Sequence, residues 1–157
     1  MEPSVSILFA VMTVLSPMLT KAGFDEASDI DRQQLYCAAQ NVYFESRGEP
    51  DLGQMAVTQV VLNRMESSRW PDSICGVIWQ DKQFSWTHDG KSDTINVGNK
   101  LTRLAWMKSV FYAVMAMIED DVTNGATHYH NTSVKPYWAD SMMQTAVIGN
   151  HIFYREE

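Results

Sequence analysis

The sequence predicts an α+β fold that is mostly helical and carries a small β-sheet. Two observations predict the helices. Apolar residues recur at helical spacing in several long windows, and capping residues stand at the ends of these windows. A third observation predicts the sheet, because turn dipeptides and short apolar segments gather near the carboxyl terminus. The length of 157 residues indicates one domain that is large enough to bury a core.

The first apolar run spans residues 5–19 (VSILFAVMTVLSPML), and its role stays open between three alternatives. The run is shorter than the about 20 residues of a comfortable membrane span, but it suits the apolar part of a signal peptide. No Lys or Arg precedes it, however, and Lys21 is unusual so close to a cleavage point. The third alternative is a hydrophobic helix that packs on its own domain. Residues 22–30 are small and acidic, and they predict a linker.

The next helix is predicted from Arg32 to Ser46. Asp31, followed by Gln34 three residues later, resembles a capping box. Gly48 is suited to end the helix in a left-handed conformation, and Pro50 prevents its continuation. Apolar residues recur at helical spacing along it: Leu35, Ala38, Ala39 and Val42.

Three more helices follow. One begins near Pro50 and Asp51, a short one is capped by Ser73 and runs to Ile78, and the longest runs from Lys100 to Asp120. Residues 67–72 and 87–99 have the composition of loops. The predicted buried positions of the first helix are Met55, Val57, Val60, Val61 and Met65. Those of the longest helix include Leu101, Leu104, Ala105, Val110, Val114 and Ile118.

The sheet is predicted in two pieces. Asn124 and Gly125 mark a turn, after which residues 126–131 are expected to form a strand with Thr127, Tyr129 and Asn131 on one face. Residues 147–154 are expected to form a hairpin around Gly149-Asn150.

Composition limits the classes of partner. The net charge is −7, from 12 basic and 19 acidic residues, and no stripe of Lys or Arg marks a phosphate-binding face. We therefore expect no nucleic-acid partner. No Cys/His spacing indicates a metal site, and we expect neither metal nor cofactor. Cys37 and Cys75 would pair if the protein leaves the cytosol. The alternative, two buried free thiols, is the one that we expect.

The segment YFESRGEP (43–50) contains two glutamates four residues apart. Extending the apolar stripe of Ala38 and Val42 by three residues places Glu45 on the core-facing flank of the last helical turn. Burial disfavours the carboxylate and raises its pKa, as a general acid near neutral pH requires. The alternative is that Glu45 only pairs with a base such as Arg47 or Arg64.

Glu49 is not expected to act as the second carboxylate of a two-carboxylate glycosidase. Gly48 ends the helix, and a residue before proline prefers an extended backbone. Glu49 is therefore expected at the start of the next helix, where it interacts with the helix dipole or the exposed amides.

Two segments combine aromatic and amide side chains, namely residues 79–87 (WQDKQFSWT) and 127–131 (THYHN), with Pro136-Tyr137-Trp138 close behind. Aromatic rings stack on the C–H faces of sugars, whereas amides and hydroxyls bind sugar hydroxyl and N-acetyl groups. These segments are therefore suited to line a glycan groove. The alternative is that the aromatic residues belong to the core.

Taken together, the pattern resembles the SleB/CwlJ-type cell-wall hydrolases, the family of spore cortex-lytic-enzyme catalytic domains. The resemblance rests on residues 41–64 (NVYFESRGEPDLGQMAVTQVVLNR), 69–80, 83–86, 125–131 and 148–154, and covers nearly everything from Leu35 to Tyr154. It implies a lysozyme-like, resuscitation-factor-like fold and cleavage of peptidoglycan. The motif's first glutamate is the family's catalytic acid, which is Glu45 here.

The resemblance also implies a reaction. Family members are similar to lytic transglycosylases, which cut between N-acetylmuramic acid and N-acetylglucosamine and form a 1,6-anhydro product with one carboxyl group. Tyr129 and Asn131 are candidates for binding the sugars. Gln83 and Ser85 are further candidates, and Trp86 is the candidate stacking platform.

The resemblance divides the chain into an N-terminal segment (1–30) and a catalytic domain (31–157). We expect the domain to act in the host periplasm or cell wall, with transient membrane contact through residues 5–19, as a phage endolysin or a bacterial wall-remodelling enzyme. The alternatives are an N-acetylmuramoyl-L-alanine amidase, a muramidase that uses water, and a non-catalytic glycan-binding or virion module.

Overall fold

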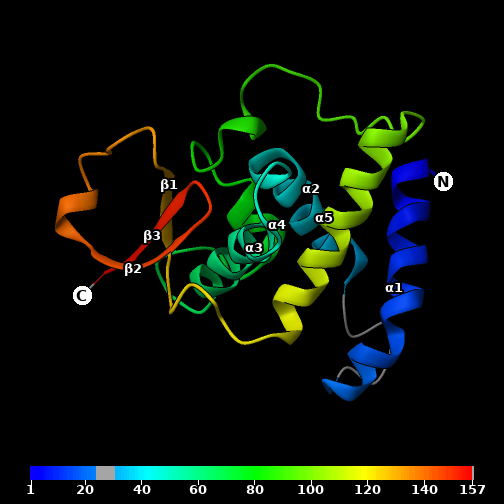
Figure 1. Cartoon of the computed structure of the whole chain (residues 1–157), viewed down its shortest axis with the longest axis horizontal. Coiled ribbons are helices and arrows are strands. Elements are labelled where there is room, and N and C mark those ends of the chain that lie inside the picture. The colour runs from blue at the N-terminus through cyan, green and yellow to red at the C-terminus, as the bar shows by residue number, and fades with distance from the viewer. Residues whose placement is uncertain (24–30, 157) are drawn as a thin grey trace.

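The computed structural model describes residues 1–23 and 31–156 and has a helical body with a small sheet at one end (Figure 1). The helix α1 (Pro3–Lys21) lies at the opposite end from the sheet. Between them lie α2 (Arg32–Ser46), α3 (Asp51–Met65), α4 (Ile74–Ile78) and α5 (Lys100–Ile118). The predicted fold class, α+β and mostly helical, is confirmed. Of the predicted linker, residues 24–30 lie outside the described residues.

The predicted bounds of α2 are confirmed, but its two ends differ in detail from the prediction. Asp31 caps the helix by accepting hydrogen bonds from the amides of Gln33 and Gln34. The side chain of Gln34 does not close the capping box, because its Oε1 accepts a bond from the amide of Cys75 at 2.8 Å. The prediction of a left-handed Gly48 is wrong. Its φ is not positive, and the chain leaves the C-cap Arg47 through a turn in which the amide of Glu49 donates to the carbonyl of Ser46.

The core of the body forms where α2, α3 and α5 meet. Val57, Val60 and Val61 of α3 are buried as predicted. On α5, however, the buried face is centred on Trp106, Val110, Ala113 and Val114, and the predicted core positions Leu101 and Leu104 are exposed. The fully buried Trp106 sets the packed face of the helix, and the two leucines that precede it lie off this face.

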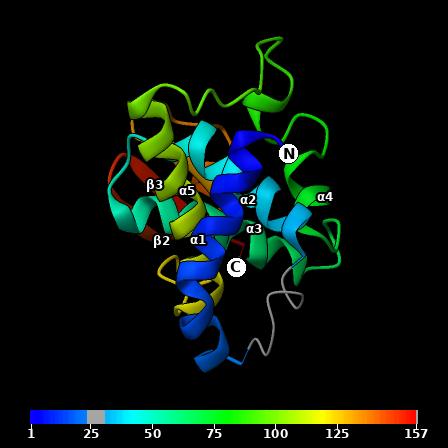
Figure 2. The same cartoon turned by 90° about the vertical axis from the view of Figure 1, so that its right-hand side faces the viewer.

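Helix α1 packs along α5 through one face, as both views show (Figure 2). Leu8, Met12, Leu15 and Leu19 are buried at the spacing of a helical stripe. The indole Nε1 of Trp106 donates a hydrogen bond to the carbonyl of Ser4 at 2.9 Å, which fixes the start of α1 on the core. This is the arrangement that the third alternative predicts, a hydrophobic helix that packs on its own domain. A role as signal or anchor stays a prediction. By length and composition alone, α1 and α5 are both apolar enough to cross a membrane.

The sheet has three antiparallel strands in the order β1 (His128–Asn131), β3 (His151–Arg155) and β2 (Met143–Ile148). The predicted turn before β1 is confirmed, with positive φ at Asn124 and Gly125, and so is the hairpin between β2 and β3. Tyr129 is paired with Phe153, which is fully buried against α3 together with Ala56 and Val60. The face of the sheet that carries Tyr129 therefore packs on the helical body.

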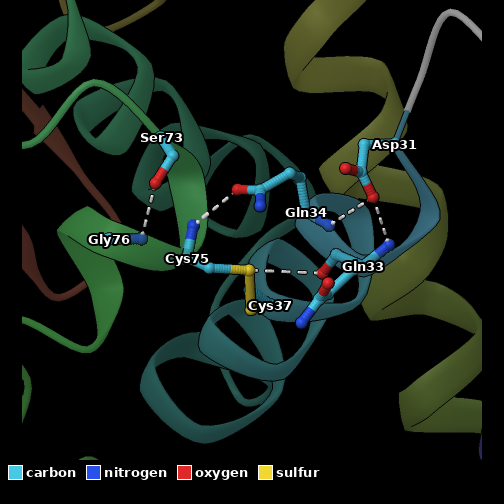
Figure 3. The surroundings of a disulfide bond; sticks show 7 residues. All are labelled: Asp31, Gln33, Gln34, Cys37, Ser73, Cys75 and Gly76. Atoms are coloured by element: carbon cyan, nitrogen blue, oxygen red, sulfur yellow. Dashed lines mark hydrogen bonds between the residues drawn. A yellow bond between two sulfur atoms is a disulfide. The ribbon is translucent and has the colours of Figure 1, made fainter.

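The expectation of two free thiols is wrong, because Cys37 and Cys75 form a disulfide (Figure 3). Cys37 lies in α2 and Cys75 in α4, so the bridge joins two helices. Ser73 caps α4 as predicted, accepting a hydrogen bond from the amide of Gly76. The pairing depends on how α4 docks on α2, which residue spacing alone does not reveal.

Replacing both cysteines by alanine is expected to lower the free energy of unfolding by about 3–4 kcal/mol, because the bridge closes a loop of 38 residues in the unfolded chain. Urea unfolding of the oxidised wild type and of the double variant measures the difference. Reductant should bring the wild type to the midpoint of the variant and leave the variant unchanged. Equal midpoints of oxidised wild type and variant would contradict a stabilising bridge.

Candidate active site

Glu45 lies in the last turn of α2 and is partly buried, as the apolar stripe of that helix predicts. Loss of water around the carboxyl group raises its pKa above the ordinary value, and this is the largest influence on the group. A hydrogen bond from Tyr129 and the positive charge of Arg64 oppose the rise. The environment thus favours the protonated acid and still stabilises the carboxylate.

Tyr129 reaches Glu45 from the sheet. Its hydroxyl donates a hydrogen bond to Oε2 of Glu45 at 3.1 Å. The ring lies 5.0 Å from that of His151 and 5.4 Å from that of Phe153, both on β3. Burial raises the pKa of the phenol well above its ordinary value, so the hydroxyl keeps its proton and acts as a donor. Tyr129 was predicted to bind sugar, and the structure also places it on the candidate acid.

Arg64 is the third charged or polar group at the site. Its side chain is buried, and its Nε donates to the carbonyl of Thr127 at 2.7 Å. Burial lowers the pKa of the guanidinium, but arginine remains charged at physiological pH. Among the described residues, no base lies within ion-pair distance of Glu45, which argues against the simple pairing alternative. The sequence indicated Arg64 only as a partner of that kind. Its spacing from Val57 and Val60, on the buried face of α3, was the signal in the sequence that could have placed Arg64 inside the fold.

Glu49 binds the hairpin instead of its own helix. Its Oε1 accepts a hydrogen bond from the amide of Asn150 at 2.8 Å, and its Oε2 accepts one from the side-chain amide of Asn150 at 3.2 Å. Nδ1 of His151 lies 3.6 Å from Oε1. The expectation that Glu49 interacts with the dipole or the exposed amides of α3 is therefore wrong, because its hydrogen-bond partner is Asn150 of the hairpin. Its two oxygens are engaged in holding the β2–β3 turn.

The close contact at this turn requires glycine. Gly149 has a φ of +57°, and a Cβ added there would lie 2.7 Å from Cδ of Pro50 and 2.9 Å from Oε1 of Glu49. The turn therefore rests directly on the segment that links α2 to α3. This contact ties β3, and with it the strand that carries Tyr129, to the end of the helix that carries Glu45.

The other predicted site residues differ in how close they lie to the groups around Glu45. Oε1 of Gln83 lies 3.5 Å from Nη1 of Arg64, so Gln83 belongs to the neighbourhood of Glu45. Ser85 is exposed at the start of the short helix η2 (Ser85–Thr87). Asn131 is exposed at the end of β1, where its Oδ1 accepts a hydrogen bond from the amide of Ser133.

Trp86 does not fit the predicted role of a stacking platform. Only 5% of its surface is exposed, its ring stacks on Phe44 at 4.8 Å, and its Nε1 donates to the buried side chain of Asn41 at 2.9 Å. The core therefore covers the ring that a sugar would need. Trp79, which packs edge-on against Trp86 at 5.1 Å, is 44% exposed and offers an aromatic surface instead.

The sequence matches the profile of the Cell Wall Hydrolase family over residues 48–154. The chain belongs to this family. Among curated members, it is 37% identical over 127 residues to the spore cortex-lytic enzyme of Halalkalibacterium halodurans, covering 80% of this chain and 35% of that protein. It is 36% identical over 117 residues to that of Bacillus subtilis, covering 73% and 35%.

Solved structures of Cell Wall Hydrolase relatives confirm the fold. The catalytic domain of the germination-specific lytic transglycosylase SleB from Bacillus anthracis superposes with a TM-score of 0.67 at 31% identity, over 80% of this chain and 97% of that chain. The catalytic domain of Bacillus cereus SleB gives 0.66 at 32% identity, over 80% and 91%. The chain spans between a third and a half of the curated relatives' length but nearly all of these catalytic domains. The predicted lysozyme-like SleB-type family is thereby confirmed.

Replacing Tyr129 by Phe should raise the pKa of Glu45 further, because the hydrogen bond that opposes the effect of burial is lost. Titration of the Glu45 carboxyl carbon by NMR measures the change. Ser133→Ala, a change of an exposed side chain next to the sheet, is the control and should leave the titration unaltered. A lower or equal pKa in Tyr129→Phe would show that the hydroxyl does not act on Glu45.

Replacing Gly149 by Ala should destabilise the fold by more than Gly90→Ala. Both glycines have positive φ, which costs an alanine about 1 kcal/mol. Only at position 149 does the new Cβ also meet Pro50 and Glu49, since nothing lies within 4 Å of it at position 90. Thermal unfolding of the two variants separates the contact from the backbone effect. Equal losses would show that the turn does not rest on the Pro50 segment.

Proposed function

We propose that this protein cleaves the glycan strand of peptidoglycan between N-acetylmuramic acid and N-acetylglucosamine, as a lytic transglycosylase with Glu45 as its acid and base. The observation that carries the proposal is the partly buried Glu45, whose pKa is raised and whose Oε2 accepts a hydrogen bond from Tyr129. Membership of the Cell Wall Hydrolase family supports it. So does the similarity to a catalytic domain described as a lytic transglycosylase.

In the first step, Glu45 donates its proton to the glycosidic oxygen, and the bond from that oxygen to C1 of the muramic acid breaks. The bond from Tyr129 occupies Oε2, and among the described residues Oε1 has no hydrogen-bond partner. Oε1 is therefore the oxygen that can carry the proton to the substrate. Because burial favours the protonated form, Glu45 is suited to begin the reaction as an acid.

In the second step, the Glu45 carboxylate accepts the proton of the C6 hydroxyl while O6 forms a bond to C1. The product is a 1,6-anhydro sugar, no water is consumed, and Glu45 regains its proton. The hydroxyl of Tyr129 and the charge of Arg64 stabilise the carboxylate between the steps. One carboxyl group suffices for this sequence, and Glu49 is engaged with the hairpin.

Gln83, Ser85, Tyr129 and Asn131 remain our candidates for binding the sugars, and the hydrogen bond of Tyr129 adds a role in orienting Glu45. We further propose that residues 31–157 are the catalytic unit and that the protein works at the cell wall outside the cytosol. The disulfide supports such a compartment, because disulfides persist in oxidising surroundings.

The alternatives differ in what they require. A muramidase that uses water would need a group to activate that water, and the nearby Glu49 is engaged with Asn150. A zinc amidase would need a ligand set, and in residues 1–23 and 31–156 no three His, Cys, Asp or Glu side chains converge to hold a metal. A binding-only module would not require an acid with a raised pKa.

Replacing Glu45 by Gln is expected to reduce lysis of purified peptidoglycan by at least about 100-fold, because the proton donor is lost while the shape is kept. Turbidity of a cell-wall suspension measures the loss. The variant should fold at least as stably as the wild type at pH 7. Burial raises the pKa of Glu45 in the folded state above that in the unfolded chain. As the pH rises from the unfolded to the folded pKa, ionisation of Glu45 therefore lowers the stability of the wild type, whereas Gln has no such cost. Undiminished lysis would remove Glu45 from the mechanism.

Mass spectrometry of the muropeptides released by the wild type is expected to detect anhydro ends, one water lighter than hydrolysed ends. Free reducing ends would indicate a muramidase instead. New amino termini, together with loss of activity on chelation, would indicate an amidase.

A further inference from the structure

A pocket of about 220 Å³ lies where the sheet meets the loop that follows α3, and two arginines, Arg69 and Arg155, line it together with Trp70 and Thr127. We propose that this pocket binds a carboxylate of the peptide side chain that peptidoglycan carries on its muramic acid. The inference rests on the proposed function, and it adds a second point of recognition beside the cleavage site.

The pocket is built from segments that are distant in sequence. Arg69 and Trp70 come from the loop after α3, Thr127 precedes β1, and Arg155 is the last residue of β3. Strand β3 leads to the C-terminal end of the chain (Figure 1). Gly125 borders Arg155, and a Cβ added at Gly125 would touch its Nη1 at 3.9 Å. Both arginine side chains are exposed, so a ligand can reach the guanidinium groups from solvent.

The local charge is opposite to that of the whole protein. The chain has a net charge of −7, yet among the residues that the structure describes the lining holds two arginines and one acid, Glu156, and Arg64 lies against the lining residue Trp70. His128 is exposed to the same positive charges. Burial lowers its pKa most, the charges of Arg64 and Arg69 lower it further, and the charge of Glu156 raises it. In a protein whose net charge is negative, such a concentration of guanidinium groups favours an anionic ligand.

Arg155 is the group with the greatest capacity for a new partner. Within residues 1–23 and 31–156, no carboxylate lies at ion-pair distance from it. Arg69 is paired with Glu156, but both side chains are exposed. An exposed pair contributes at most about 1 kcal/mol, so a substrate carboxylate can displace Glu156. A guanidinium also binds a carboxylate through two parallel hydrogen bonds, which lysine cannot do.

Arg64 lies between the pocket and Glu45, in contact with the pocket and acting on Glu45 through its charge. The ring of Trp70 has the guanidinium of Arg69 at 5.2 Å and that of Arg64 at 5.6 Å from its centre. The carbonyl of Thr127, a lining residue, accepts the hydrogen bond from Arg64. Arg64 in turn acts on the pKa of Glu45. For this pocket to bind it, a strand whose glycosidic oxygen lies at Glu45 has to extend its peptide side chain toward the two exposed arginines.

The test compares two substrates, intact peptidoglycan and glycan strands from which an amidase has removed the peptides. Arg155→Gln should raise the half-saturating concentration of intact peptidoglycan at least about threefold and leave that of the stripped strands unchanged. Lys91→Gln, which removes the same charge from an exposed loop, is the matched control and should affect neither substrate. Arg155→Lys should recover only part of the loss, because the two-bond geometry is missing.

Binding measured in the Glu45→Gln protein by sedimentation with each polymer gives a readout that does not depend on turnover. There, too, Arg155→Gln should weaken the binding of intact peptidoglycan alone. An equal effect on both polymers, or none on either, overturns the proposed pocket. Failure of the proposed function would have a different signature, since the Glu45→Gln variant would then cleave both substrates as fast as the wild type.

Discussion

The hydrogen bond from Tyr129 to Glu45 joins the two parts of this fold at the point where chemistry is proposed. Glu45 belongs to a helix of the body and Tyr129 to the small sheet, 84 residues later. Neither part alone gives the carboxyl group both a partly dry environment and a donor. The packing of Phe153 against α3 holds the sheet at the distance that this bond requires.

The link between α2 and α3 has a corresponding structural role. Its glutamate, Glu49, accepts hydrogen bonds from the hairpin, and its proline meets Gly149. Nε2 of Gln54, a residue of α3, donates a hydrogen bond to the carbonyl of Glu49 at 3.0 Å, so α3 supports the same segment. The two glutamates of YFESRGEP thus have different tasks. One is the proposed acid, and the other binds the hairpin of the sheet that carries Tyr129.

The sequence was most informative where local rules decide the structure. Helical spacing and the cap at Asp31 predicted α2 to the residue, and they placed Glu45 on its buried flank. The Gly149-Asn150 turn was equally clear. Tertiary contacts decided the rest. The disulfide needs α4 beside α2, and the burial of Trp86 needs Asn41 and Phe44 around it. No pattern of spacing contains these neighbours.

The disulfide has a consequence for the candidate acid, although it lies away from the acid itself. Cys37 and Glu45 are on one helix, eight residues or about 12 Å apart along its axis. The disulfide near one end of α2 and the tyrosine contact near the other add two side-chain restraints to the packed face of the helix, one at Cys37 and one at Glu45 itself.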